Sequence, residues 1–172
     1  MRMTTKLRIA AGALALAACT NPAGLGGDAA DGAGAGTGAP AVVPGSAQDP
    51  TSAAFFQQSV GDRVFFEVDQ STLTAAGQAT LDGQAAWLLT NTDYTAIIEG
   101  HADEQGTREY NLALGARRAD AARAYLVSKG VAETRLRVVS YGKERPVEVC
   151  SDEACYAQNR RAVTVLAGGL TS

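Results

Sequence analysis

The sequence predicts an α/β (α+β) layered domain over residues 51–172, with helices packed on one sheet. The first observation is that apolar residues recur with a strand-like period of two in some stretches and a helix-like period in others. The second is that these stretches alternate along the chain in the order β-α-β-α-β-(α)-β. An alternation of this kind implies helices layered against a sheet.

Four short stretches predict the strands of this sheet. In DRVFFEVDQS, the apolar side chains of Val64, Phe66 and Val68 alternate with polar or differently directed ones. The other three strands are predicted at YTAIIEG (Tyr94 to Gly100), RLRVVSYG and AVTVLA. Together they supply the surface on which the helices would pack.

Two longer stretches and one short stretch predict the helices. The first runs from Thr74, a suitable N-cap, to Thr90, with one face formed by Gly77, Leu81, Ala85 and Leu88. The second runs from about Arg108 to Lys129 and is ended by Gly130. Its expected buried stripe is Leu112, Gly115, Ala119, Ala122 and Leu126. SDEACYAQNR predicts a short helix that begins near Ser151.

The first eighteen residues predict a signal peptide rather than part of the domain. Three basic residues precede or interrupt a short apolar run that ends at Ala18, and this run is too short to span a bilayer. Leu16-Ala17-Ala18-Cys19 resembles a bacterial lipobox, which implies cleavage before Cys19 and lipid modification of that cysteine. Because Thr20 stands where an aspartate would resemble the inner-membrane retention signal, we expect the outer membrane, with the domain facing the periplasm.

Residues 19–50 predict a flexible tether that follows the lipidated cysteine. Gly, Ala, Pro and Asp dominate this segment, so it cannot bury enough apolar surface to offset its ordering entropy. About 30 residues of this composition span roughly 30 Å on average and at most ~100 Å. A lipid anchor followed by a tether suggests a domain that reaches a target away from the membrane.

Charge and cysteine usage narrow the class of function. Removal of residues 1–18 takes the net charge from −3 to −6, and an acidic chain does not suit nucleic acid. If Cys19 is acylated, Cys150 and Cys155 remain as an even pair, which can form a disulfide in an oxidising compartment. Two free thiols or half of a metal site are the alternatives. With one histidine and no second C-x-x-C, a zinc site is improbable.

The stretch GHADEQGTREYNLALGARRA, Gly100 to Ala119, carries the candidate site. His101 with Asp103 or Glu104 suits general acid–base catalysis, but a nucleophile motif and a second histidine are lacking. The same three residues are a weak signature for a metal. Asp103 and Arg118 instead suit a zwitterionic ligand, because the acid can bind an ammonium and the guanidinium a carboxylate. A purely structural Asp103–Arg118 salt bridge is the fourth interpretation.

A family resemblance favours the zwitterion interpretation. Asp103-x10-Leu114-Gly115-x2-Arg118-Ala119, with Gly106-x3-Tyr110-Asn111 inside it, resembles the peptidoglycan-binding motif of the OmpA C-terminal-like family. The likeness continues through Ser140-Tyr141-Gly142 and Asn159-Arg160-Arg161, and covers roughly Val64 to Val165. It implies a two-layer sandwich on one mixed sheet. The lipobox and tether are similar to those of the lipoproteins of the Tol–Pal system.

The resemblance implies a non-enzymatic peptidoglycan binder without a cofactor or a metal. Its ligand would be the diaminopimelate group of the stem peptide, bound by Asp103, Arg118 and Asn111. Phe66 and Asp69 would form pocket wall, and Arg161, or less surely Arg160, would face the site. The implied partners are peptidoglycan, outer-membrane lipid and the periplasmic protein TolB, and the implied role includes envelope constriction at division.

Two departures and two rival functions accompany this hypothesis. Ala102 and Gly115 replace the threonine and serine that the family usually has, which removes two hydroxyl groups and keeps the charged pair. A flagellar stator subunit shares this domain, but needs a transmembrane helix with an ion-carrying acid, which the sequence lacks. A wall hydrolase would instead use His101 or a carboxylate pair, and release of soluble muropeptides would reveal it.

Overall fold

The computed structural model describes residues 42–149 and 151–168. The predicted signal peptide, the lipidation site Cys19, most of the predicted tether and Cys150 lie outside these residues. The predictions that concern them therefore stay predictions.

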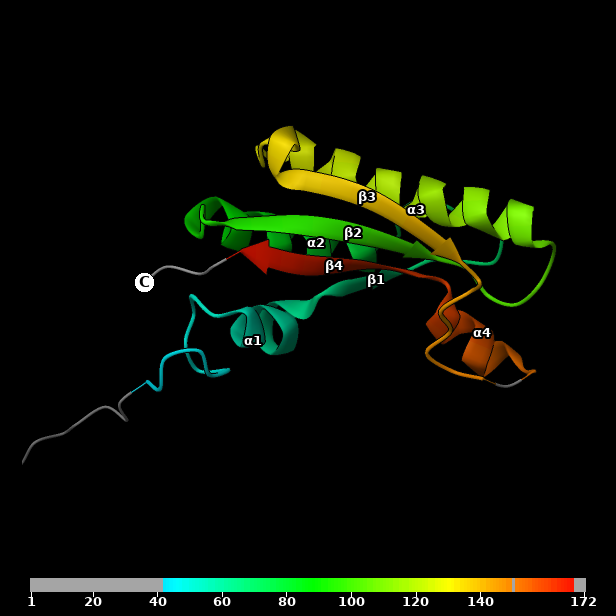
Figure 1. The fold of residues 1–172 in the computed structure, drawn as a ribbon, viewed down its shortest axis with the longest axis horizontal. Coiled ribbons are helices and arrows are strands. Elements are labelled where there is room, and N and C mark those ends of the chain that lie inside the picture. Colours follow the sequence, from blue (N-terminus) through cyan, green and yellow to red (C-terminus); the bar gives the residue numbers. More distant parts are fainter. Residues whose placement is uncertain (1–41, 150, 169–172) are drawn as a thin grey trace, which may run out of the picture. The chain divides into compact units, whose positions relative to one another are not determined.

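A four-stranded mixed sheet forms one layer of the domain (Figure 1). The parallel pair β2–β3 is joined through β2 to β4, and β4 runs antiparallel to both β2 and β1. The strand order is β1-β4-β2-β3. The strands are β1 (Arg63–Phe65), β2 (Tyr94–His101), β3 (Leu136–Gly142) and β4 (Arg161–Gly168).

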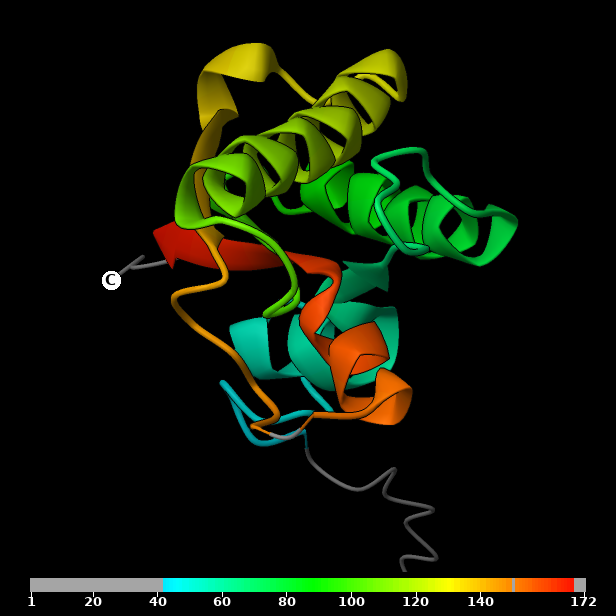
Figure 2. The ribbon, with the colours of Figure 1, turned by 90° about the vertical axis from the view of Figure 1, so that its right-hand side faces the viewer.

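The helices α2 (Ala75–Thr90) and α3 (Arg108–Ser128) form the second layer, side by side on one face of the sheet (Figure 2). Each helix begins at a threonine whose hydroxyl accepts a backbone N–H, from Gly77 at Thr74 and from Tyr110 at Thr107. The two-layer α+β class predicted from the sequence is thereby confirmed. The bounds of both helices agree with the prediction to within one residue.

The core lies between these layers. Its largest fully buried apolar side chains come from the segment before β1, from β1, α2, β2 and α3, and from just after α3: Phe56, Val64, Leu81, Leu88, Ile98, Leu126 and Val131. The predicted face of α2 is buried throughout. On α3 the prediction was wrong for Leu112, which is 46% exposed. The buried stripe of α3 passes instead through Asn111, Leu114 and Arg118, so Leu112 points away from its centre.

The chain is already ordered upstream of residue 51, where we expected the domain to begin. Residues 42–52 form hydrogen-bonded turns, and α1 (Ala53–Phe55) continues directly into a π-helical turn, Phe56–Gly61. The indole N–H of Trp87 donates to Pro50 O at 2.8 Å, and the ring of Phe56 packs 4.9 Å from that of Trp87. This segment is thereby fixed to α2.

Strand β1 is shorter than its alternating sequence predicts. It ends at Phe65, although Phe66 N–H still donates to Arg160 O at 2.9 Å. The chain then turns, with Asp69 in the left-handed region at φ +57° and Val68 53% exposed. The turn replaces the end of the expected strand and brings residues 67–70 against α3.

The short helix α4 (Glu153–Asn159) lies near the end of the sheet where β2 and β3 finish (Figure 1). Asp152 caps it, because its carboxylate accepts the N–H of Cys155 at 3.1 Å. Cys155 is disulfide-bonded. Its predicted pairing with Cys150 stays a prediction, since Cys150 lies outside the described residues.

Candidate functional site

A pocket of about 290 Å³ opens at the end of the sheet where β1 and β2 finish. Three segments build it: the turn after β1, the loop after β2 and the first turns of α3. Its lining residues are Val68, Asp69, Asp103, Gln105, Gly106, Tyr110, Asn111 and Leu114. A larger hollow of about 710 Å³ lies at the opposite end of β2, near Tyr94, and contains none of the predicted site residues.

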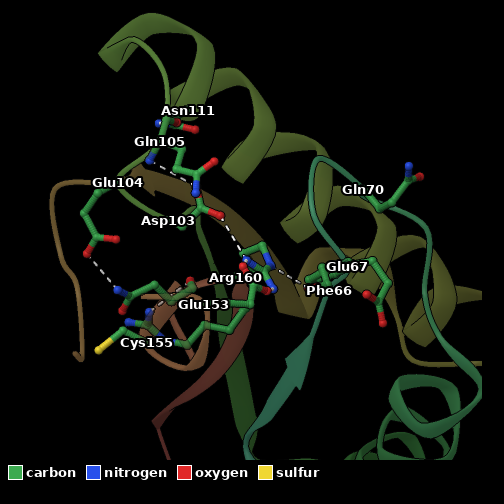
Figure 3. A network of polar contacts seen from close by, with 12 residues as sticks. Phe66, Glu67, Gln70, Asp103, Glu104, Gln105, Asn111, Glu153, Cys155 and Arg160 are labelled. Atoms are coloured by element: carbon green, nitrogen blue, oxygen red, sulfur yellow. Dashed lines mark hydrogen bonds and ion pairs between the residues drawn. The ribbon is translucent and has the colours of Figure 1, made fainter. Parts of the chain in front are cut away.

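Asp103 presents a nearly buried carboxylate to this pocket, with 7% of the residue exposed. One oxygen accepts the backbone N–H of Gln105 at 3.2 Å. The other forms an ion pair with a guanidinium nitrogen of Arg160, also at 3.2 Å (Figure 3). The carboxylate is therefore held in place by two donors while it faces the cavity.

Arg118 is fully buried and is bound by three backbone carbonyls. Its N–H groups donate to Gln70 O at 2.8 Å, His101 O at 2.9 Å and Glu67 O at 3.2 Å. Burial lowers the pKa of Arg118 to about 10, against the opposing effect of the Asp103 charge. The guanidinium is therefore a cation at neutral pH, and three of its five N–H groups are used by the main chain.

The two residues of the predicted pair, Asp103 and Arg118, thus lie in the same region of the domain, but they do not form a direct ion pair. Asp103 lines the pocket and pairs with Arg160, whereas Arg118 lies behind the turn 67–70 that forms one pocket wall. Their charges still interact, since Asp103 acts on the pKa of Arg118. The structural salt bridge considered from the sequence joins Asp103 to Arg160 instead.

Asn111 and Asp69 both line the pocket. The amide of Asn111 is buried and donates to Gln105 O at 2.7 Å, which fixes the loop after β2. Asp69 accepts a short hydrogen bond from the hydroxyl of Tyr110, and this bond raises the pKa of Tyr110. Tyr110 was not predicted as a site residue, although it stands beside Asn111 in the motif.

Phe66 and Arg161 lie outside the pocket lining. The ring of Phe66 packs under the Arg118 guanidinium at 5.3 Å and is buried. Arg161 donates to Asn159 O at 3.3 Å and Arg145 O at 3.1 Å. Of the two adjacent arginines, Arg160 is the one that reaches Asp103.

A second set of polar contacts, absent from the sequence prediction, fixes the loop after β2. Asn159 donates to the carboxylate of Glu104 at 2.8 Å and accepts the N–H of Val147 at 2.9 Å. Lys143 donates to Gly106 O at 2.7 Å. The motif Asn159-Arg160 was the only sequence signal for these contacts.

His101 contributes its main chain rather than its ring. Its carbonyl binds Arg118, while the ring is 2% exposed and lies 5.6 Å from Tyr141. Burial, and then the charges of Arg161 and Arg145, lower the pKa of His101 to about 4, so the imidazole is neutral at pH 7. Its 3.7 Å approach to Glu99 is therefore not an ion pair at that pH.

Neither a metal centre nor a membrane span stands out in the part of the chain that the structure describes. Among these residues, no three His, Cys, Asp or Glu side chains are grouped so that they could hold a metal ion. Over the same ranges, no helix has both the length and the hydropathy needed to cross a bilayer.

Comparison with known proteins identifies the family. The family model described as the OmpA family matches residues 65–160. The peptidoglycan-associated lipoprotein of Rhizobium meliloti is 58% identical over 155 residues, which are 90% of this chain and 83% of that protein. That of Mesorhizobium japonicum is 60% identical over 131 residues, or 76% and 74% of the two chains. The chain therefore belongs to the OmpA family, and within it to the peptidoglycan-associated lipoproteins.

Solved structures agree with this assignment. The crystal structure of the peptidoglycan-associated lipoprotein from Burkholderia pseudomallei matches with a TM-score of 0.64 and 40% identity, over 69% of this chain and all of that chain. The C-terminal domain of Helicobacter pylori MotB matches with a TM-score of 0.58 at 18% identity, over 62% and 84% of the two chains. The second likeness shows a shared fold. The family and the OmpA-like fold predicted from the sequence are confirmed.

Proposed function

We propose that this protein binds peptidoglycan non-covalently, through the diaminopimelate group of the stem peptide. The observation that carries the proposal is the pocket in which the buried Asp103 carboxylate faces a cavity beside Asp69, with the Arg118 cation directly behind its wall. Membership of a family whose members are named for association with peptidoglycan supports it.

The chemistry of the pocket suits a group that carries an ammonium beside a carboxylate. The ammonium would bind the Asp103 carboxylate, which keeps lone pairs beyond those used by Gln105 and Arg160. The carboxylate would bind N–H groups of Arg118. The carbonyls that cover Arg118 belong to Glu67 and Gln70, in the same turn as the pocket residue Asp69. A shift of this turn would give the ligand access to the guanidinium.

The proposed role is mechanical rather than enzymatic. Lipid on Cys19 would hold the protein in the outer membrane, and the part of segment 19–50 that precedes the hydrogen-bonded turns would bridge the gap. The domain would bind the cell wall without turnover. Through the Tol–Pal system, with TolB as partner, the protein would support envelope integrity and constriction at division. Purified protein that releases soluble muropeptides from peptidoglycan would contradict this role and favour a hydrolase.

Sedimentation with purified peptidoglycan tests the binding. We expect Asp103→Asn to remove most of the sedimented fraction, because the amide cannot bind an ammonium as an ion pair. The fold should persist, since Arg160 keeps its pairing with Glu153. Asp120→Asn is the matched control, because Asp120 is an exposed acid on the same helix as Arg118 and makes one loose pair with Arg123 at 3.8 Å. Equal sedimentation of the two variants would refute Asp103 as a ligand contact.

A further inference from the structure

Arg160 lies between two carboxylates that belong to different cavities. On one side it contacts Asp103, at 3.2 Å, in the pocket described above. On the other it contacts Glu153, through one short bond and one of 3.4 Å, in a neighbouring hollow of about 360 Å³ (Figure 3). The Arg160 side chain is 4% exposed, whereas that of Glu153 is 64% exposed. One buried cation is thus shared by a pocket acid and an outer acid.

The position of Arg160 is fixed by the main chain as well as by these acids. Its Nε donates to Phe66 O at 3.2 Å, and the Arg160 carbonyl accepts the N–H of Phe66 at 2.9 Å. The guanidinium of Arg160 therefore cannot move towards or away from Asp103 without breaking its contacts with the main chain of Phe66. A change of charge at Glu153 acts on Asp103 mainly through the field of a fixed Arg160.

We propose that Glu153 is a positioning residue for ligand binding, which keeps Asp103 attractive to an ammonium group by neutralising Arg160 from the far side. This inference rests on the proposed function. Asp103 and Arg160 alone form a pair with no net charge, which attracts a cation weakly. With Glu153 the three groups carry one net negative charge, and Asp103 is the member that faces the ligand pocket.

The shielded location strengthens this effect. Both Asp103 and Arg160 are nearly buried, so water screens their interaction less than it screens an exposed ion pair. Glu153 also lies in the first turn of α4, the helix that leads directly into Asn159 and Arg160. The residue that tunes the pocket is therefore 50 positions away from Asp103 in sequence, in an element outside the pocket lining.

The test is a titration of the folded protein with a soluble muropeptide that carries a diaminopimelate-containing stem peptide. We expect Glu153→Gln to weaken binding about 3- to 10-fold at low ionic strength, and less as salt is added. Glu133→Gln is the control. Glu133 pairs with Arg123 at 2.7 Å, and its side chain is 67% exposed, a fraction similar to that of Glu153. It lies beside the start of β3, at the opposite end of that strand from the pocket. Its effect should stay within about 2-fold.

A second ligand separates this electrostatic role from a structural one. In the same muropeptide with its free amino group acetylated, the ammonium that Asp103 attracts is gone. The Glu153→Gln variant should then bind this ligand as well as the wild type does. If the substitution instead loosens α4, the affinity for both ligands should fall equally. Glu153→Asp, which keeps the charge, should recover part of the lost affinity for the unmodified ligand.

Each outcome has a distinct meaning. If the wild type does not bind the unmodified muropeptide, the proposed function fails and this inference fails with it. If the wild type binds and Glu153→Gln matches Glu133→Gln, the proposed function stands and the role of Glu153 is refuted. An equal loss for both ligands also refutes it, in favour of a structural contribution of α4.

Discussion

Arg118 is the residue on which the arrangement of the pocket wall depends. Its three hydrogen bonds join the turn after β1 to the end of β2 through a single buried side chain. Truncation would leave the carbonyls of Glu67, Gln70 and His101 without these donors and would open a cavity beside Phe66. Arg118 therefore has a structural task in addition to any contact with ligand.

We expect Arg118→Ala to lower the free energy of unfolding by about 3 to 5 kcal/mol, because buried carbonyls lose charged donors. Urea denaturation followed by circular dichroism measures this loss. Asp103→Asn should cost much less, which makes it the cleaner variant for binding studies. A change below about 1 kcal/mol for Arg118→Ala would show that other donors or water replace the guanidinium.

His101 gives the domain a defined response to acid. Its pKa is about 4 in the folded state and about 6.5 when unfolded, so only the unfolded chain takes up the proton between these values. The contribution of His101 to the free energy of unfolding is fully present above about pH 6.5. It falls by about 3 kcal/mol as the pH drops towards 4. Neither ring nitrogen has a hydrogen-bond partner among the described residues.

His101→Phe should therefore remove this part of the pH dependence. The phenyl ring fills a similar space against Tyr141 and has no proton to gain. Urea denaturation at pH 7, 5.5 and 4.5 should show the wild type losing stability relative to the variant as the pH falls. Parallel curves for the two proteins would contradict the assignment of a neutral buried imidazole.

At this scale the sequence predicted the pocket acids and the amide better than it predicted their partners. Asp69 and Asp103 occur within motifs that place them just beyond strand ends, Asn111 is predicted near the start of the long helix, and all three line the pocket. The pairing of Asp103 with Arg160 spans 57 residues. A local sequence pattern cannot predict this pairing, because the pairing depends on how α4 folds back towards β2.

Glycines lie at the crossing of α3 and β2, where the two backbones approach each other closely. A Cβ added to Gly100 would fall well inside van der Waals contact with the backbone carbonyl of Gly115. A Cβ added to Gly115 would lie 2.5 Å from Ser140 Oγ and 2.9 Å from Gly100 O. At position 115 a glycine replaces the serine that the family resemblance leads us to expect. The glycine lets the backbone of α3 approach the backbone of β2 closely.

We expect Gly100→Ala to destabilise the domain by more than about 3 kcal/mol, because the added methyl group meets a rigid carbonyl. Gly83→Ala is the matched control, since it lies on the exposed side of α2 where a Cβ would make ordinary contact with Val60 at 3.5 Å. It should raise stability by up to about 1 kcal/mol. Thermal unfolding of both variants decides, and equal melting temperatures would refute the close crossing.

Periodicity predicted the two long helices and the strands β2, β3 and β4 well, but it predicted neither the end of β1 nor the helical segment before it. Helices α2 and α3 are long enough for many turns to agree on one buried face. Strand β1 ends early because a turn at Asp69 overrides the alternation, which the sequence carries on through Phe66 and Val68. The helical segment from Ala53 to Gly61 has too few turns for a period to appear, and it is held by Trp87 from elsewhere in the chain.

For the whole molecule, the proposed membrane anchor is a single cysteine, Cys19. We expect Cys19→Ser to abolish labelling by radioactive palmitate and to move the protein from the membrane fraction to the soluble periplasmic fraction once peptidoglycan is digested. The digestion step matters because the wall would otherwise retain the protein. A variant that still fractionates with membranes after digestion would contradict the lipid anchor.

The hydrogen bonds of residues 46–52 have a mechanical consequence. Tension that enters along the chain from the N-terminal side first meets the bonds from Ser52 to Ser46 O, from Trp87 to Pro50 O and from Tyr94 to Thr51 O. Only after these give way can the pull reach β1 and the turn that covers Arg118. If the pocket binds peptidoglycan as proposed, these bonds would take up the load first, and the geometry of the pocket would stay unchanged until they break.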